Sequence, residues 1–147
     1  MSDTLFRLVY CSRNTIPAGP GDAAAVASIL AASRANNARD GVTGALLYSD
    51  GCFAQVLEGG LAAVQHTFER IQRDPRHNDL VVLEARPAEA RLFGAWDMAL
   101  AEAADPARAR AILGQALAEP GGDAGTTVVA LLDGLVRRGG DWALAAE

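Results

Sequence analysis

A glutamine lies in the middle of GCFAQVLEG, residues 51–59, a stretch with the composition of a β-strand. Side chains alternate along a strand, so Phe53, Gln55 and Leu57 share one face, and the two large apolar residues mark that face as buried. A buried amide without a hydrogen-bond partner costs about 1–3 kcal/mol. Gln55 is therefore expected either to have a structural partner or to hold a ligand.

Other polar side chains are predicted to lie near Gln55. Tyr10 ends an apolar face of a strand at residues 5–11, and Ser33 and Asn37 continue, at helical spacing, the apolar stripe of a helix. A few hydrogen-bonding groups that converge in an apolar cavity are typical of a small-molecule pocket.

The walls and the mouth of this predicted pocket come from further segments. Alternation along a fifth strand gives that strand an apolar face beside the pocket. Ile29 and Ile71 are predicted to form the walls of the pocket, and Arg76 and His77 its mouth. Trp96 and Met98 are predicted to lie on the apolar face of the fifth strand.

Each residue also has a structural interpretation. A buried tyrosine usually donates to a backbone carbonyl, and tryptophan and methionine are more often core residues than ligand contacts. Asn36 and Asn37 lie near a helix end, where asparagine is a common capping residue. Taken singly, these residues do not decide between packing and ligand binding.

The segments that position these residues follow the order β-α-β-β-α-β-β. The order predicts an α+β, ferredoxin-like fold with both helices on one face of the sheet. Strand patterns occur at residues 5–11, 42–49, 51–59, 79–86 and 95–101, and helix patterns at 23–40 and 61–74.

Two further helices are predicted beyond this unit. Asp105 is a capping residue followed by Pro106 at the first helical position, and that helix runs to about Leu117. The second covers TTVVALLDGLVRR, residues 126–138, and is expected to end at Gly139. Because short helices are unstable alone, both must pack on the free face of the sheet, on a second subunit, or on both.

Length and composition limit the possible functions. The 147 residues suit one domain, predicted at 1–103, with 104–147 as a helical extension too short to be independent. The net charge of −5 argues against nucleic-acid binding, and no apolar run is long enough to span a membrane. There is no signal-peptide pattern, and no histidine or cysteine spacing suits a metal. Cys11 and Cys52 are interpreted as reduced packing residues of a cytoplasmic protein.

Five motifs, in order, resemble the BLUF family, the blue-light sensors that use flavin. They are LVYCSR, ASRANNARDGVTGALLY, FAQVLEG, RIQRDPRHNDLVVLE and WDMAL, and they span about residues 4–101. Two departures stand out. The segment NTIPAGPGD is longer than usual for the family, and some members carry a histidine at the position of Asn36, which changes contacts at the ring edge.

The resemblance implies that the pocket holds FAD, or in some members FMN, without a covalent bond. It implies that Asn37 bonds the pyrimidine edge of the flavin, with Asn36 and Ser33 nearby on the same helix. Gln55 would lie between Tyr10 and the flavin. By the same resemblance, Ile29 and Ile71 sandwich the ring, Arg76 and His77 lie at its edge, and Trp96 or Met98 approaches the glutamine.

The implied function is that of a photoreceptor, not an enzyme. Light would draw an electron and a proton from Tyr10 through Gln55, and recombination would leave the amide rotated or tautomerised and the absorption shifted to the red. The expectation is therefore a short stand-alone sensor, without an attached effector domain, that signals through its C-terminal helices. Its expected partners are an unidentified downstream protein and copies of itself, as a homodimer or a larger oligomer.

Two alternatives belong to other classes. One is a ferredoxin-like enzyme of the acylphosphatase type, but CSRNTIPAGPG lacks a clear phosphate cradle. The other is a flavin-binding or partner-binding module that has lost its light response. The presence of both Tyr10 and Gln55 argues against the second alternative.

Overall fold

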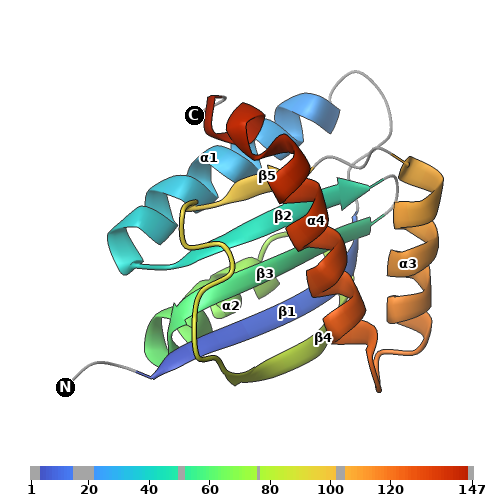
Figure 1. Cartoon of the computed structure of the whole chain (residues 1–147), viewed down its shortest axis with the longest axis horizontal. Helices are drawn as coiled ribbons and strands as arrows, with labels where there is room; N and C mark the ends of the chain where they lie inside the picture. The colour runs from blue at the N-terminus through green and yellow to red at the C-terminus, as the bar shows by residue number, and fades with distance from the viewer. Residues whose placement is uncertain (1–3, 15–21, 50–51, 76, 102–104, 146–147) are drawn as a thin grey trace.

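The structure is a computed structural model of the chain, and it describes residues 4–14, 22–49, 52–75, 77–101 and 105–145. Its element order confirms the predicted β-α-β-β-α-β-β unit followed by two helices (Figure 1). The elements are β1 (Leu5–Asn14), α1 (Asp22–Asp40), β2 (Thr43–Ser49), β3 (Cys52–Gly60), α2 (Leu61–Gln72), β4 (His77–Pro87), β5 (Ala99–Ala101), α3 (Pro106–Ala118) and α4 (Ala124–Ala145).

The strands form one sheet in the order β4-β1-β3-β2-β5. Strand β1 lies between β4 and β3 and is antiparallel to both, β2 is antiparallel to β3, and the short β5 is parallel to β2. The register places Tyr10 of β1 directly opposite Gln55 of β3. Directly opposite residues on one face have Cβ atoms about 5 Å apart, so the ladder itself brings these two side chains together.

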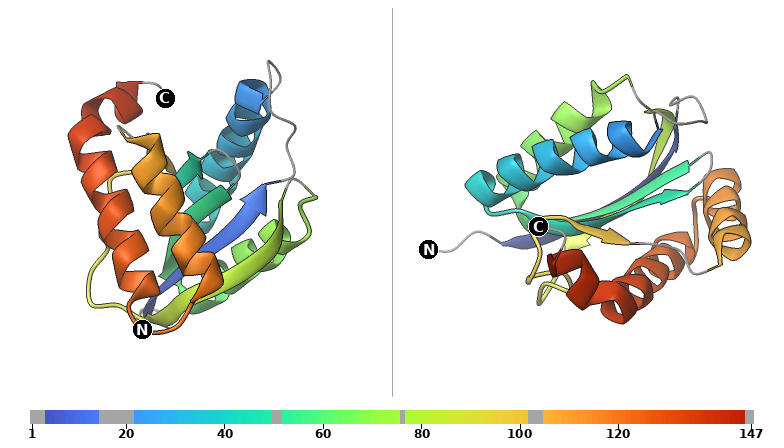
Figure 2. Two further views of the ribbon diagram at one scale, coloured as in Figure 1. Left: turned by 90° about the vertical axis from the view of Figure 1, so that its right-hand side faces the viewer. Right: turned by 90° about the horizontal axis from the view of Figure 1, so that it is seen from above.

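The sheet has helices on both faces. Helices α1 and α2 cover one face, and α3 and α4 cover the other (Figure 2). The alternation of β3 therefore buries two sets of side chains: Phe53 and Leu57 pack toward α1 and α2, and Ala54 and Val56 pack toward α3 and α4. The sequence left open where the two C-terminal helices pack, and in the structure they pack on the free face of the sheet.

Local sequence signals explain several element ends. Helix α1 ends at Asp40 because Gly41 takes the left-handed conformation, with φ of 72°, and the Val42 N–H turns back to the Asn37 carbonyl at 3.0 Å. Helix α3 begins where predicted, since the Asp105 side chain accepts from the Arg108 N–H at 3.1 Å.

The last strand and the last helix differ from the prediction. Strand β5 covers Ala99–Ala101 and not residues 95–101, because the carbonyls of the two residues before Ala99, Asp97 and Met98, accept hydrogen bonds from side chains of α1. Helix α4 does not end at Gly139 but continues to Ala145. Gly139 and Gly140 each cost about 1 kcal/mol relative to alanine, and the helix continues through both of them. Within the described ranges, no helix combines the length and the apolar character that a bilayer span requires.

Candidate functional site

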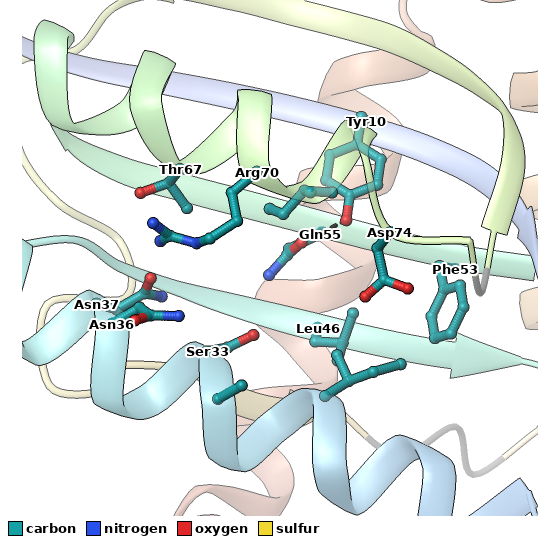
Figure 3. A pocket seen from close by; sticks show the side chains of 13 residues that line it. Tyr10, Ser33, Asn36, Asn37, Leu46, Phe53, Gln55, Thr67, Arg70 and Asp74 are labelled. Carbon is teal, nitrogen blue, oxygen red and sulfur yellow. Dashed lines mark hydrogen bonds between the residues drawn. The ribbon is translucent and has the colours of Figure 1, made fainter.

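A cavity of about 260 Å³ lies between α1, α2 and the sheet. Figure 3 shows its lining side chains converging from both helices and from the central strands. Its walls combine apolar groups with carboxamides, hydroxyls and the charged side chains of Arg70 and Asp74. The lining residues are Tyr10, Ile29, Ala32, Ser33, Asn36, Asn37, Leu46, Phe53, Gln55, Thr67, Arg70, Ile71 and Asp74.

Tyr10 and Gln55 form the floor of the cavity. The Tyr10 hydroxyl donates a hydrogen bond to Oε1 of Gln55, and both side chains are only 3% exposed. Burial, followed by the negative charge of Asp74 and of Cys11, raises the pKa of Tyr10 above its ordinary value of 10.0. The phenol is therefore neutral at physiological pH and keeps a proton that it can pass to the amide oxygen.

The other end of the Gln55 amide faces Met98. Its Nε2 donates to the Met98 sulfur at 3.4 Å, and Met98 is completely buried. A thioether is a weak acceptor, so this contact holds the amide nitrogen less firmly than Tyr10 holds the oxygen. Both ends of the buried Gln55 amide therefore have a hydrogen-bond partner in the protein.

Trp96 does not share the face of Met98, and the prediction that both side chains lie on one face is wrong for Trp96. The residue lies before β5, where the chain is irregular, so strand alternation does not apply there. Its side chain packs against the hydrophobic cluster under α3 and α4. Within the described part of the chain, its indole nitrogen is buried and has no hydrogen-bond partner.

Helix α1 brings Ser33, Asn36 and Asn37 to the cavity, as its polar stripe predicts. Asn37 is 1% exposed, and its Nδ2 donates to the backbone carbonyl of Asp97 at 2.8 Å. One amide therefore borders the cavity and also holds the segment that carries Met98.

Ile29 of α1 and Ile71 of α2 lie at the cavity from opposite helices, in the places expected for its two walls. The expected mouth residues cannot be compared in the same way. Arg76 lies outside the described residues. His77 begins β4 and pairs with Asn14 in the backbone ladder, but its side chain is not described.

Three polar residues of the cavity were not predicted, namely Thr67, Arg70 and Asp74. Thr67 is 3% exposed, and its hydroxyl makes no hydrogen bond to any described residue. A signal for it exists in the sequence, because Thr67 interrupts the apolar side of α2 one turn before Ile71, as Ser33 interrupts that of α1. A buried hydroxyl without a protein partner, facing a cavity, suits the polar part of a bound molecule.

A family model described as sensors of blue-light using FAD, the BLUF family, matches residues 5–99. Among characterised proteins, the photoactivated adenylate cyclase subunit beta of Euglena gracilis is 36% identical over 90 residues, which cover 61% of this chain and 10% of the relative. The chain thus spans about a tenth of the length of that relative.

Solved structures agree in fold. The dark-state structure of BlrB, a BLUF protein, has a TM-score of 0.70 and 31% identity, and the match covers 92% of this chain and 97% of that one. Klebsiella pneumoniae BlrP1 with FMN and cyclic diGMP has a TM-score of 0.62 and 27% identity over 78% of this chain and 35% of that one.

Proposed function

Because the chain belongs to the BLUF family, the sensors of blue light using FAD, we propose that its cavity holds a flavin and that the protein is a blue-light photoreceptor. The observation that carries this proposal is the hydrogen bond from Tyr10 to Gln55 at the floor of the cavity between α1 and α2. It places an oxidisable phenol and a neutral amide in series, next to the space where a ring would lie.

The lining of the cavity fits a flavin. An isoalloxazine ring has apolar faces and a polar edge, so it needs apolar walls and a few hydrogen-bonding groups at one side. Ile29 and Ile71 supply the walls, and Asn37 and Ser33 reach the cavity from one side of α1. The Thr67 hydroxyl, which has no partner among the described residues, is a further group that a bound flavin would satisfy.

A flavin held in this cavity would supply an electron acceptor under blue light, and Tyr10 is placed to be the donor. Tyr10 gives the electron, and its proton moves to Oε1 of Gln55 along the existing hydrogen bond. When the electron and the proton have both returned, Tyr10 is again a neutral phenol, and the Gln55 amide alone is left rotated or tautomerised. An amide can change in this way because it presents both a donor and an acceptor without carrying charge.

The signal then leaves the cavity through Met98. The rearranged amide gives up its contact with the Met98 sulfur, and Met98 directly precedes β5. On the opposite face, Ala99 and Ala101 of β5 belong to the cluster that α3 and α4 cover. A small shift of β5 therefore alters the surface on which the C-terminal helices pack.

We further propose FAD as the cofactor, with FMN as the alternative, and a sensory and not an enzymatic role. Arg76 and His77 remain proposed flavin contacts from the resemblance alone, as does Asn36 for the ring edge. The proposed partners are a separate downstream protein and a second copy of the chain. A cytoplasmic location is proposed from the interpretation of Cys11 and Cys52 as reduced packing residues.

Light-difference spectroscopy tests the function. The purified chain, incubated with FAD and freed of unbound cofactor, is expected to be yellow. Blue light is expected to shift its absorption to the red, and the shift is expected to decay in the dark. A preparation that stays colourless would contradict flavin binding, and a yellow preparation without a shift would identify a light-insensitive flavin module.

A further inference from the structure

A carboxylate is buried completely on the face of the sheet opposite the flavin cavity. Glu58 of β3 is 0% exposed, on the side covered by α3 and α4. Its Oε2 accepts from Nε of Arg7 and from the Leu92 N–H, both at 2.9 Å, and its Oε1 accepts from the Phe93 N–H at 2.9 Å. A buried charge is retained only where such partners offset the loss of water.

Arg91, an exposed residue next to Leu92 and Phe93, makes further hydrogen bonds to the same part of the sheet. Its guanidinium donates to the Thr43 hydroxyl at 2.9 Å, to the Gly41 carbonyl at 2.9 Å and to the Glu58 backbone carbonyl at 3.3 Å. Together, Glu58 and Arg91 therefore fix the residues from Arg91 to Phe93 against the start of β2 and the end of β3.

The other end of this segment carries Met98. Its backbone carbonyl accepts from Nε of Arg34 at 3.0 Å, and the Asp97 carbonyl accepts from Asn37 at 2.8 Å. Beside it, the backbone of β3 comes so close to Gly44 that no side chain fits there, and Met98 lies at contact distance from the same position. A Cβ at position 44 would lie 1.9 Å from the Val56 carbonyl oxygen and 3.4 Å from Cε of Met98.

The segment Arg91–Met98 is thus irregular in backbone but held at both ends. A methionine side chain has three rotatable bonds and makes only weak hydrogen bonds, so it does not fix its own position. The distance from its sulfur to the Gln55 amide depends on where the segment places its Cα atom. Because the Met98 side chain is completely buried, holding its Cα atom in place limits the range of that distance.

We propose that Glu58, together with Arg91, is a positioning residue for the light response, acting through Met98 on the Gln55 amide. This inference rests on the proposed function. A carboxylate is required because two oxygens accept three donors, whereas a glutamine would offer one acceptor and set its NH₂ group against a backbone N–H. Glu58 itself would not touch the flavin, because its side chain lies on the face of the sheet opposite the cavity.

The test uses the full chain loaded with FAD. Glu58→Gln is compared with Glu84→Gln, the same chemical change on β4, where Glu84 pairs with Arg86 at 3.2 Å in the edge strand opposite β5. Glu58→Gln is expected to keep the yellow colour and to change the dark-recovery rate by about tenfold, the factor that corresponds to losing one hydrogen bond to a charged group. Glu84→Gln is expected to recover at the wild-type rate.

A second measurement observes Met98 directly. The chain has two methionines, so the methyl spectrum of protein labelled with ¹³C at the methionine methyl groups has only two signals. Met98→Leu identifies the Met98 signal. That signal is expected to shift or broaden in Glu58→Gln and to stay unchanged in Glu84→Gln, both in the dark.

A double variant separates positioning from general destabilisation. If Glu58 acts through Met98, Glu58→Gln changes recovery far less in a Met98→Leu background than in the wild type. If Glu58→Gln does not fold, Arg91→Gln replaces it, because Arg91 is exposed and holds the same segment.

Two results would overturn the proposal: wild-type recovery together with an unmoved Met98 signal in Glu58→Gln, or an undiminished effect of that change in the Met98→Leu background. If the wild-type chain gives no light response at all, the proposed function fails. In that case the Met98 methyl signal in the dark, compared between the wild type and Glu58→Gln, is the measurement that tests whether Glu58 positions Met98.

Discussion

The two ends of the Gln55 amide, the acceptor oxygen and the donor nitrogen, have hydrogen-bond partners of different strength. Its oxygen accepts a hydrogen bond from a buried phenol, while its nitrogen donates to the sulfur of Met98 at 3.4 Å. The nitrogen end therefore makes the weaker bond, and an amide that turns loses little when it leaves Met98. A leucine could make neither contact, and a glutamate would add a buried charge beside a phenol whose pKa is already raised.

The Thr67 hydroxyl tests whether the cavity is shaped for a polar ligand. Thr67→Val removes the hydroxyl and keeps the shape, so a bound flavin that uses it would lose one hydrogen bond. The dissociation constant for FAD, measured by flavin fluorescence, is expected to rise about fivefold. Thr126→Val, at an exposed position of α4, is the control. Equal affinity in both variants would show that the hydroxyl does not contact the flavin.

Cys11 gives a pH dependence of stability. Burial, followed by the nearby Cys52, raises the pKa of Cys11 from 9.0 to about 12. As pH rises above about 9, the unfolded chain loses this proton and the folded chain keeps it, so the free energy of unfolding falls, by at most about 1.4 kcal/mol per pH unit. Urea unfolding at about pH 8 and about pH 10 should show a smaller fall in Cys11→Ala than in the wild type. Equal falls in the two proteins would contradict the assignment.

The residues of the cavity differ in how far the sequence predicts them. Ser33, Asn37 and Gln55 interrupt apolar patterns, and the structure brings all three to the cavity. Glu58 was not predicted, because alternation places it on the face of β3 that would be exposed in a sheet covered on one side only. Only the packing of α3 and α4, which the sequence left open, turns that position into a core position.

Helix α4 lies very close to the sheet where it begins. A Cβ at Gly125 would lie 2.8 Å from Cβ of Glu84 and 3.2 Å from the Leu83 carbonyl oxygen. Gly125→Ala therefore pushes the start of α4 away from β4 and is expected to lower the free energy of unfolding by about 1–3 kcal/mol.

The matched control is Gly114→Ala in α3, where a Cβ would meet no described atom within 4 Å. Alanine is the better helix former, so this variant is expected to gain about 0.5–1 kcal/mol in urea unfolding. A Gly125→Ala variant as stable as Gly114→Ala would show that α4 does not approach β4 this closely.

Elements with strong local signals were predictable, and those set by tertiary contacts were not. The start of α3 follows from the Asp105–Pro106 pair, and the structure has the expected cap. The short β5 could not be predicted, because the carbonyls before Ala99 bind side chains of α1, which are far away in sequence. Trp96 was misplaced for the same reason, since alternation fails where the backbone is not extended.

The whole molecule depends on covering both faces of one sheet. The connection from β4 to β5 joins the two edges of the sheet and passes on the side of α3 and α4 (Figure 1). Residues of this connection bind Glu58 on that side, while Met98 at its end turns to the flavin side. One segment thus contacts both layers, and the cavity and the C-terminal helices share a core element.

We therefore expect that the part of the chain before the predicted boundary at residue 103 does not fold stably without the helices that follow it. A chain that ends at residue 103 would expose the apolar cluster that α3 and α4 cover, including Val9, Leu47 and Val56. It is expected to aggregate or to bind the dye ANS, whereas a chain that ends after residue 139 keeps every residue of α3 and α4 that is described as buried and is expected to stay monodisperse in size-exclusion chromatography. A stable, dye-negative 1–103 fragment would contradict this dependence.

The link from phenol to amide to flavin is tested most directly by removing one hydroxyl. The chain has two tyrosines, Tyr10 in the cavity and Tyr48 on β2, where its ring lies 5.2 Å from that of Phe53. In FAD-loaded protein, light-minus-dark absorption is expected to show the red shift in the wild type and in Tyr48→Phe. Tyr10→Phe is expected to stay yellow but to show no shift. A normal, reversible red shift in Tyr10→Phe would contradict the proposed photochemistry.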